Sequence, residues 1–168
     1  MQSGGPIKES TMKILKRLGA SAALGLLLAA TAHAQVSVDN AWIRASVPGQ
    51  KSTGAFMTVR APADSKLVEA HSDVARSTEI HEMKMEGDVM RMRQVDSVAL
   101  PAGKAVELKP GGYHIMLMDL QRQMTTGEHV PLTLVTESAD GKRHTQRIEV
   151  EVRPLTTQRS GNAHHKAH

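Results

Sequence analysis

Apolar and polar side chains alternate along most of the chain after residue 35. In the segment from His114 to Leu120, for example, Ile115 and Leu117 alternate with histidine and methionine residues. A period of two places successive side chains on opposite faces of a β-strand, whereas an amphipathic helix has a period near 3.6. No window of the sequence shows a sustained helical period. The pattern therefore predicts an all-β chain in which Ile115 and Leu117 point into a core.

Turn residues divide this alternating pattern into short strands. Glycine, proline and aspartate recur about every 8–12 residues, a spacing that favours an antiparallel sandwich or barrel. We predict a single-domain antiparallel Greek-key β-sandwich, with Trp42 and Phe56 joining the aliphatic strand residues in its core. The expected strands are 36–38, 41–45, 54–60, 66–71, 79–85, 89–95, 98–100, 105–108, 114–120, 130–137 and 143–152.

The first 34 residues have the pattern of a secretory signal peptide that follows a short extension. A basic segment ending at Arg17 precedes an apolar run over residues 18–30, and residues 32–34 match an A-x-A cleavage site. The apolar run is shorter than the about 20 residues that span a bilayer. We therefore expect export to the periplasm and no stable membrane span after cleavage, with an uncleaved anchor as the alternative. Translation could begin at Met1 or Met12.

Removing this segment changes the charge of the protein. The full chain has 21 basic and 17 acidic residues and a net charge of +4. The chain after residue 34 keeps 17 basic and 16 acidic residues, which leaves +1. It also has only one Trp, one Tyr and one Phe. Because nucleic-acid surfaces combine positive charge with stacking rings, no nucleic-acid partner is expected.

The remaining chain is expected to form one domain over residues 35–155, which is long enough to build a single core. The polar segment 156–168 is expected to be a disordered tail. The chain has no cysteine, which excludes thiol redox chemistry and a blue-copper site. No Gly-x-Ser-x-Gly element or other nucleophile motif is present, and we expect no enzymatic activity. The tail ends with His164, His165 and His168.

Histidine and methionine residues gather in three of the predicted strands. Residues two apart in a strand share a face, so the alternate positions of each strand line up. Thioether sulfur selects Cu(I) and imidazole suits copper, whereas zinc, calcium and magnesium prefer other ligands. Core packing is the alternative, because methionine often fills gaps in apolar interiors. The residues are His81, Met83, Met85, Met90, Met92, His114, Met116 and Met118.

The first two of these strands read as a hairpin, and its turn decides which side chains face each other. A turn centred on Glu86 and Gly87 would place His81 opposite Met92, close enough for one ion to bridge them. A turn centred on Gly87 and Asp88 would shift every pair. We expect the first arrangement.

The spacing of four of these residues resembles the signature of a known family, the periplasmic CuA chaperones called PCuAC. Ten residues separate His81 from Met92, and twenty-one separate Met92 from His114, which is followed by Met116. The resemblance extends over roughly residues 38–154. It includes Ala41-Trp42-Ile43-Arg44, Pro48-Gly49-Gln50, Gly54-Ala55-Phe56-Met57, His81-Glu82-Met83, and the segment from Pro110 to Met118.

The resemblance implies a cupredoxin-like sandwich and a Cu(I) chaperone. It implies that copper goes to the CuA-bearing subunit of cytochrome c oxidase, alongside Sco-type proteins. Some members also bind Cu(II) in a His/Met-rich tail, so the three tail histidines are a candidate Cu(II) site. The implied Cu(I) ligands are His81, Met92, His114 and Met116, with Met83 as an accessory thioether.

Two other functions remain open at the level of sequence. A copper buffer or tolerance protein without a dedicated client would need the same ligands. An immunoglobulin-like interaction module would use the methionines only for packing, and it would bind no copper.

Overall fold

The computed structural model describes residues 35–154. The expected signal peptide over residues 1–34 and the choice between Met1 and Met12 as the start lie outside these residues. The expected tail over residues 156–168 lies outside them too. In the described range, every regular element is a β-strand, and no helix is long and apolar enough to cross a membrane.

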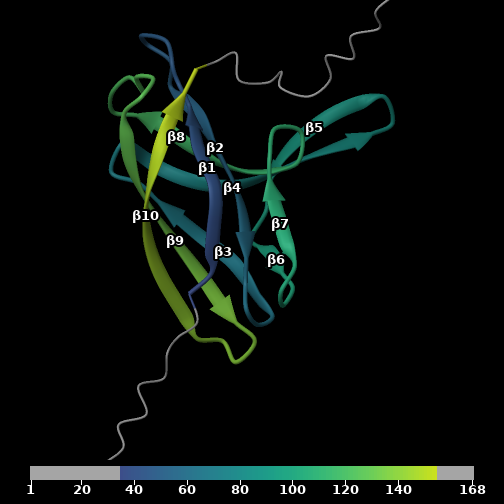
Figure 1. Ribbon diagram of the computed structural model, residues 1–168. Helices are drawn as coiled ribbons and strands as arrows, with labels where there is room; N and C mark the ends of the chain where they lie inside the picture. Colours follow the sequence, from purple (N-terminus) through teal and green to yellow (C-terminus); the bar gives the residue numbers. More distant parts are fainter. Residues whose placement is uncertain (1–34, 155–168) are drawn as a thin grey trace, which may run out of the picture. The chain divides into compact units, whose positions relative to one another are not determined.

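The prediction of an all-β chain is confirmed, and most strand boundaries differ from the expected ones by only one or two residues. Successive strands are separated by turns and short loops (Figure 1). They are β1 (Ser37–Arg44), β2 (Ser52–Arg60), β3 (Ser65–His71), β4 (Ala75–Glu86), β5 (Val89–Gln94), β6 (Val98–Leu100), β7 (Ala105–Leu108), β8 (Tyr113–Leu120), β9 (His129–Ser138) and β10 (Arg143–Arg153).

Two strands depart from the expected pattern. The segments 36–38 and 41–45 merge into β1, whose register with β2 shifts between Asp39 and Trp42. Asn40 lies in this shift with a φ of 51°, in the left-handed region that Asn tolerates better than most residues. An extra residue of this kind bends a strand without ending it. Strand β4 begins at Ala75 rather than at residue 79.

The strands follow one hydrogen-bonded path in the order β5-β4-β8-β2-β1-β10-β9-β3-β6, and β7 pairs with the second half of β2. Strand β1 pairs antiparallel with β2 on one side and parallel with β10 on the other. The remaining pairs among the described strands are antiparallel. Strand β1 therefore joins the two halves of the sandwich (Figure 1).

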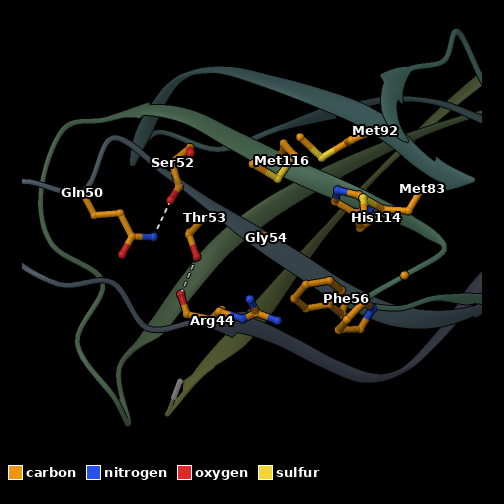
Figure 2. Close-up of a pocket in the computed structure, with 12 residues that line it drawn as sticks. Arg44, Gln50, Ser52, Thr53, Gly54, Phe56, Met83, Met92, His114 and Met116 are labelled. Carbon is orange, nitrogen blue, oxygen red and sulfur yellow. Dashed lines mark hydrogen bonds between the residues drawn. The ribbon is translucent and has the colours of Figure 1, made fainter. Parts of the chain in front are cut away.

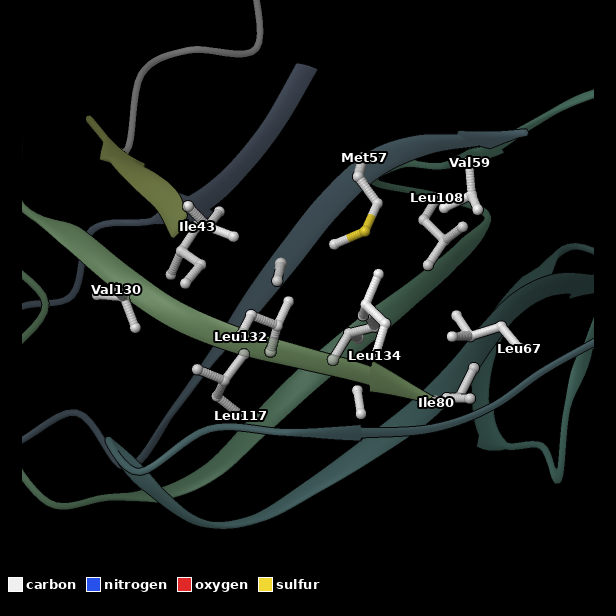
Figure 3. Close-up of a cluster of buried hydrophobic side chains, with 14 of the residues drawn as sticks. Ile43, Met57, Val59, Leu67, Ile80, Leu108, Leu117, Val130, Leu132 and Leu134 are labelled. Carbon is white, nitrogen blue, oxygen red and sulfur yellow. The ribbon is translucent and has the colours of Figure 1, made fainter. Parts of the chain in front are cut away.

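Aliphatic side chains from the two halves meet in a single core (Figure 3). Ile115 and Leu117 of β8 are fully buried, as the alternation predicts. Burial of each side chain of this size stabilises the fold by about 1.5–3 kcal/mol. The core therefore holds β8 in place and turns its alternate residues to the opposite face. Side chains that contribute from other strands include Ile43, Met57, Leu67, Ile80, Leu132 and Leu134.

The expected core position is wrong for Trp42, which is half-buried, and holds only in part for Phe56, which is 5% exposed. Neither residue belongs to the buried core cluster, because the core side of β2 is occupied by Ala55 and Met57. The two aromatic rings lie on the other face, with their centroids 4.5 Å apart. The sandwich thus carries a small aromatic pair outside its core, on the same face as His114.

Candidate metal centre

The hairpin of β4 and β5 has a different register from the expected one. Its turn begins at Gly87, whose φ of +63° is a conformation that glycine adopts at no steric cost. Met83 therefore faces Met92, and His81 faces Gln94. The expected pairing of His81 with Met92 is therefore wrong. The two central turn residues are Gly87 and Asp88, with glycine in the first position, and each partner on β5 shifts by two residues.

On its other side, β4 pairs with β8 and brings the two histidines together. His81 lies directly opposite His114, and their ring centroids are 5.9 Å apart. The exposed fractions of the two residues are 8% and 5%. Met116 lies two residues further along β8, opposite Gly54 of β2. Gly54 and Met116 both line the space beside the Met116 thioether.

That space is an open cavity of about 340 Å³ (Figure 2). The side chains of Met92 and Met116 and the ring of His114 turn towards it from the hairpin and from β8. Met92 is 51% exposed, so one side of the cavity is accessible to solvent. The other residues that line it are Arg44, Gln50, Ser52, Thr53, Gly54, Phe56, Met83, Pro110 and Gly111.

His81 does not line the cavity, but its ring is held beside it. Its Nε2 lies 2.7 Å from Oε2 of Glu79. A carboxylate oxygen can only accept, so Nε2 of His81 carries the proton and donates. The other ring nitrogen, Nδ1, is buried and has no hydrogen-bond partner. Because buried polar atoms are nearly always paired, this nitrogen lacks a partner that a metal ion could provide.

His114 is oriented by the backbone. Its Nδ1 donates to the carbonyl oxygen of Gly112 over 3.0 Å, which leaves Nε2 with its lone pair available. Burial lowers the pKa of His114, since burial disfavours the imidazolium form, and the nearby His81 and Arg44 lower it further. The hydrogen bond to the Gly112 carbonyl opposes this shift. The ring is therefore biased towards the neutral form that binds metals.

Aromatic side chains form one wall of the cavity. The ring of Phe56 lies 6.2 Å from the ring of His114, between that ring and Trp42. The guanidinium carbon of Arg44 lies 5.5 Å from the Phe56 centroid, within the range of a cation–π contact. A Cβ at Gly54 would come within 2.7 Å of Cζ of Phe56. Glycine at this position therefore allows the ring to lie against the strand.

The structure brings His114, Met92 and Met116 around one cavity, with His81 adjacent to His114. Met83 also lines this cavity, next to its cross-strand neighbour Met92. In residues 35–154, no group of three or more His, Asp and Glu side chains could hold a metal ion. The potential metal-binding atoms on this face are instead the ring nitrogens of two histidines and the sulfur atoms of several methionines. The tail residues His164, His165 and His168 lie outside the described residues.

Several residues of this site were not found from the sequence. Glu79 could have been recognised, because it precedes His81 by two positions in a strand and therefore shares its face. The sequence contains no comparable indication that the Gly112 carbonyl accepts a hydrogen bond from His114 or that Phe56 lines the cavity. Each depends on contacts between segments that are remote in the sequence or on the shape of a turn.

A sequence model of the family described as "Putative lipoprotein LpqE-like" matches residues 36–152 of the chain. A relative from Leifsonia xyli subsp. xyli, "Putative lipoprotein Lxx21020", is 34% identical over 102 residues. The match covers 59% of this chain and spans only 60% of the length of that relative.

Solved structures with the same fold include the apo PCuAC domain from PmoF1, at 23% identity and a TM-score of 0.58. That match covers 71% of this chain and 93% of the domain. The solution structure of CuI-DR1885 from Deinococcus radiodurans is 28% identical, with a TM-score of 0.54. That match covers 74% of this chain and 83% of the DR1885 chain. The prediction of a cupredoxin-like β-sandwich is confirmed.

The environment of His114 predicts that its ring loses its proton at a lower pH than an ordinary histidine. In the metal-free protein, its pKa should lie below the usual value of about 6.5, because burial disfavours the charged ring. NMR titration of the ring carbon-bound protons measures this pKa directly. A pKa above that value would show that the hydrogen bond to Gly112 outweighs burial and would contradict the assigned environment.

Proposed function

The chain belongs to the LpqE-like family, and on that premise we propose that it is an exported, non-enzymatic Cu(I) chaperone. One observation carries the proposal. The thioethers of Met92 and Met116 and the ring of His114 line one accessible cavity, and the buried ring of His81 lies directly opposite that of His114.

The proposed ligands of Cu(I) are Nδ1 of His81, Nε2 of His114, and the sulfur atoms of Met92 and Met116. Each ring has its other nitrogen engaged, His81 with Glu79 and His114 with the Gly112 carbonyl. Such outer hydrogen bonds fix the tautomer and orientation of a metal-binding histidine. Met83, which lines the same cavity, serves as an accessory thioether.

The chemistry of this donor set favours Cu(I) over other common metals. Two imidazoles and two thioethers are neutral and include soft sulfur, which suits a soft monovalent ion. Zinc and calcium sites rely more on thiolate or oxygen ligands. Neutral ligands also leave the ion able to move to an acceptor that offers thiolates.

Similar proteins support copper as the cargo. The name of the DR1885 structure states that copper(I) is bound, and its chain is 28% identical to this one. Because the two chains also share a fold, we infer that Cu(I) binds in the cavity of this chain as well. Of the two other functions left open by the sequence, an interaction module without metal does not account for the unpartnered Nδ1 of His81.

The client of the chaperone belongs to the same proposal. Family resemblance points to the CuA-bearing subunit of cytochrome c oxidase and to Sco-type proteins, in the periplasm. The exposure of Met92 supports transfer, because an acceptor can reach the ion from the solvent side of the cavity. A Cu(II) site at the three tail histidines remains a prediction.

Replacing both thioethers of the proposed site should abolish tight copper binding. The double variant Met92→Leu/Met116→Leu should lose more than about 100-fold in Cu(I) affinity, since changes outside the ligand shell alone typically cost about 10- to 100-fold. The fold should persist, because Leu replaces Met with little change in volume. Competition titration with a Cu(I) chelator measures the affinity.

The matched control is Met118→Leu. Met118 lies on the same face of β8 as Met116 but does not line the cavity. This variant should bind Cu(I) like the unchanged protein. If the double variant instead keeps its full affinity while Met118→Leu weakens binding, the assignment of the site is wrong.

Transfer to a client distinguishes a chaperone from a copper buffer. The Cu(I)-loaded protein should give up its ion to an apo CuA domain, whose thiolates bind copper more strongly than neutral ligands. Mixing the two proteins, separating them and measuring copper in each fraction tests this. Retention of the ion by the loaded protein would favour a buffering function.

A further inference from the structure

Four methionines form two cross-strand pairs along one face of the β4–β5 hairpin. Met83 faces Met92, and Met85 faces Met90. The first pair lines the cavity, and the second lies nearer the turn at Gly87. We call these four residues the methionine ladder, with an inner pair at the cavity and an outer pair at the tip.

The outer pair is not explained by packing. Met85 is 55% exposed and Met90 is 44% exposed, so neither fills a core. The hairpin extends beyond the other strands, and its tip has no neighbouring strand to cover it (Figure 1). Two large apolar side chains in this position forgo much of the stabilisation that burial would give them.

Charged side chains of the hairpin form ion pairs on its other face. Glu82 contacts Arg93 at 2.7 Å, and Glu86 contacts Arg91 at 3.1 Å. Alternation places these residues opposite to the ladder, so the pairs can support the hairpin without occupying the sulfur face. Thioether sulfur is therefore the metal-binding atom that the ladder face offers.

The spacing suits soft-metal binding and exchange. Directly opposed residues in an antiparallel pair have Cβ atoms about 4.5–5.5 Å apart, within reach of two thioethers that bind one ion. Residues two apart along a strand are separated by about 7 Å, which brings the outer pair close to the inner pair. The ladder thus runs continuously from the exposed tip to the cavity.

We propose that Met85 and Met90 form a second soft-metal site, which takes up Cu(I) or Ag(I) and passes it to the cavity through Met83 and Met92. The passing step depends on the proposed function of the cavity, whereas binding at the outer pair does not. The ion keeps its charge throughout, because one neutral thioether replaces another at each step. Transfer inward is favoured, since imidazole nitrogen adds to the ligands there.

Silver(I) titration of the full chain with methyl-¹³C-labelled methionine tests the binding site. Ag(I) is soft and monovalent like Cu(I), and it is not oxidised in air. After the cavity residues respond, further Ag(I) should shift the methyl signals of Met85 and Met90. In Met92→Leu/Met116→Leu, which removes two cavity ligands, the signals of Met85 and Met90 should still shift. Unmoved signals at excess Ag(I) would overturn the proposal.

A second variant tests the role of the outer pair. Met85→Leu/Met90→Leu should bind one equivalent of Ag(I) fewer than the control Met118→Leu. Stopped-flow loading of the cavity with Cu(I) should be slower in this variant, while the Cu(I) affinity of the cavity stays unchanged. Equal silver stoichiometry in the two variants would overturn the second site, and equal loading rates would overturn the passing step.

These outcomes separate the two proposals. If Met116 fails to respond to Ag(I) while Met85 and Met90 shift, the proposed function of the cavity fails and the outer site stands. If Met116 responds while Met85 and Met90 do not, the cavity stands and the outer site fails.

Discussion

The pairing of β4 with β8 is the constraint on which the site depends. Ile80 lies directly opposite Ile115, and both side chains are buried in the core. The next pair, His81 and His114, must then lie on the opposite face. A slip of one residue would move the histidines into the apolar interior and expose the isoleucines. Hydrophobic burial therefore sets the position of the two imidazole rings without any metal.

The same arrangement leaves the site poised for a cation. Both rings are held by hydrogen bonds, one to Glu79 and one to the carbonyl of Gly112. The Nδ1 atom of His81 is left without a partner, which is unfavourable in an empty site and favourable once an ion binds. The strands thus hold both proposed nitrogen ligands close together, and the exposed hairpin brings the sulfur of Met92 to the same cavity.

Much of the fold could be predicted from the sequence, and Met92, His114 and Met116 line one cavity as their spacing suggested, while their role as ligands stays a prediction. Alternation at Ile115 and Leu117 gave the core face of β8, and the ligand spacing indicated His114 and Met116. The turn could not be predicted, because Gly87 can occupy either central position of a two-residue turn. The face of Phe56 could have been predicted, because Ala55, Met57 and Val59 share one face of β2 while Phe56 shares the other with Thr58 and Arg60. Its contact with the His114 ring could not, since that depends on the pairing of strands remote in the sequence.

X-ray absorption of the Cu(I)-loaded protein tests the central claim most directly, because it reports the atoms around the ion itself. Two imidazoles and two thioethers predict a first shell that contains both nitrogen and sulfur, with no thiolate. A shell of nitrogen and oxygen alone would contradict the account. It would mean that the ion binds away from Met92 and Met116, and that the cavity between the hairpin and β8 is not the copper site.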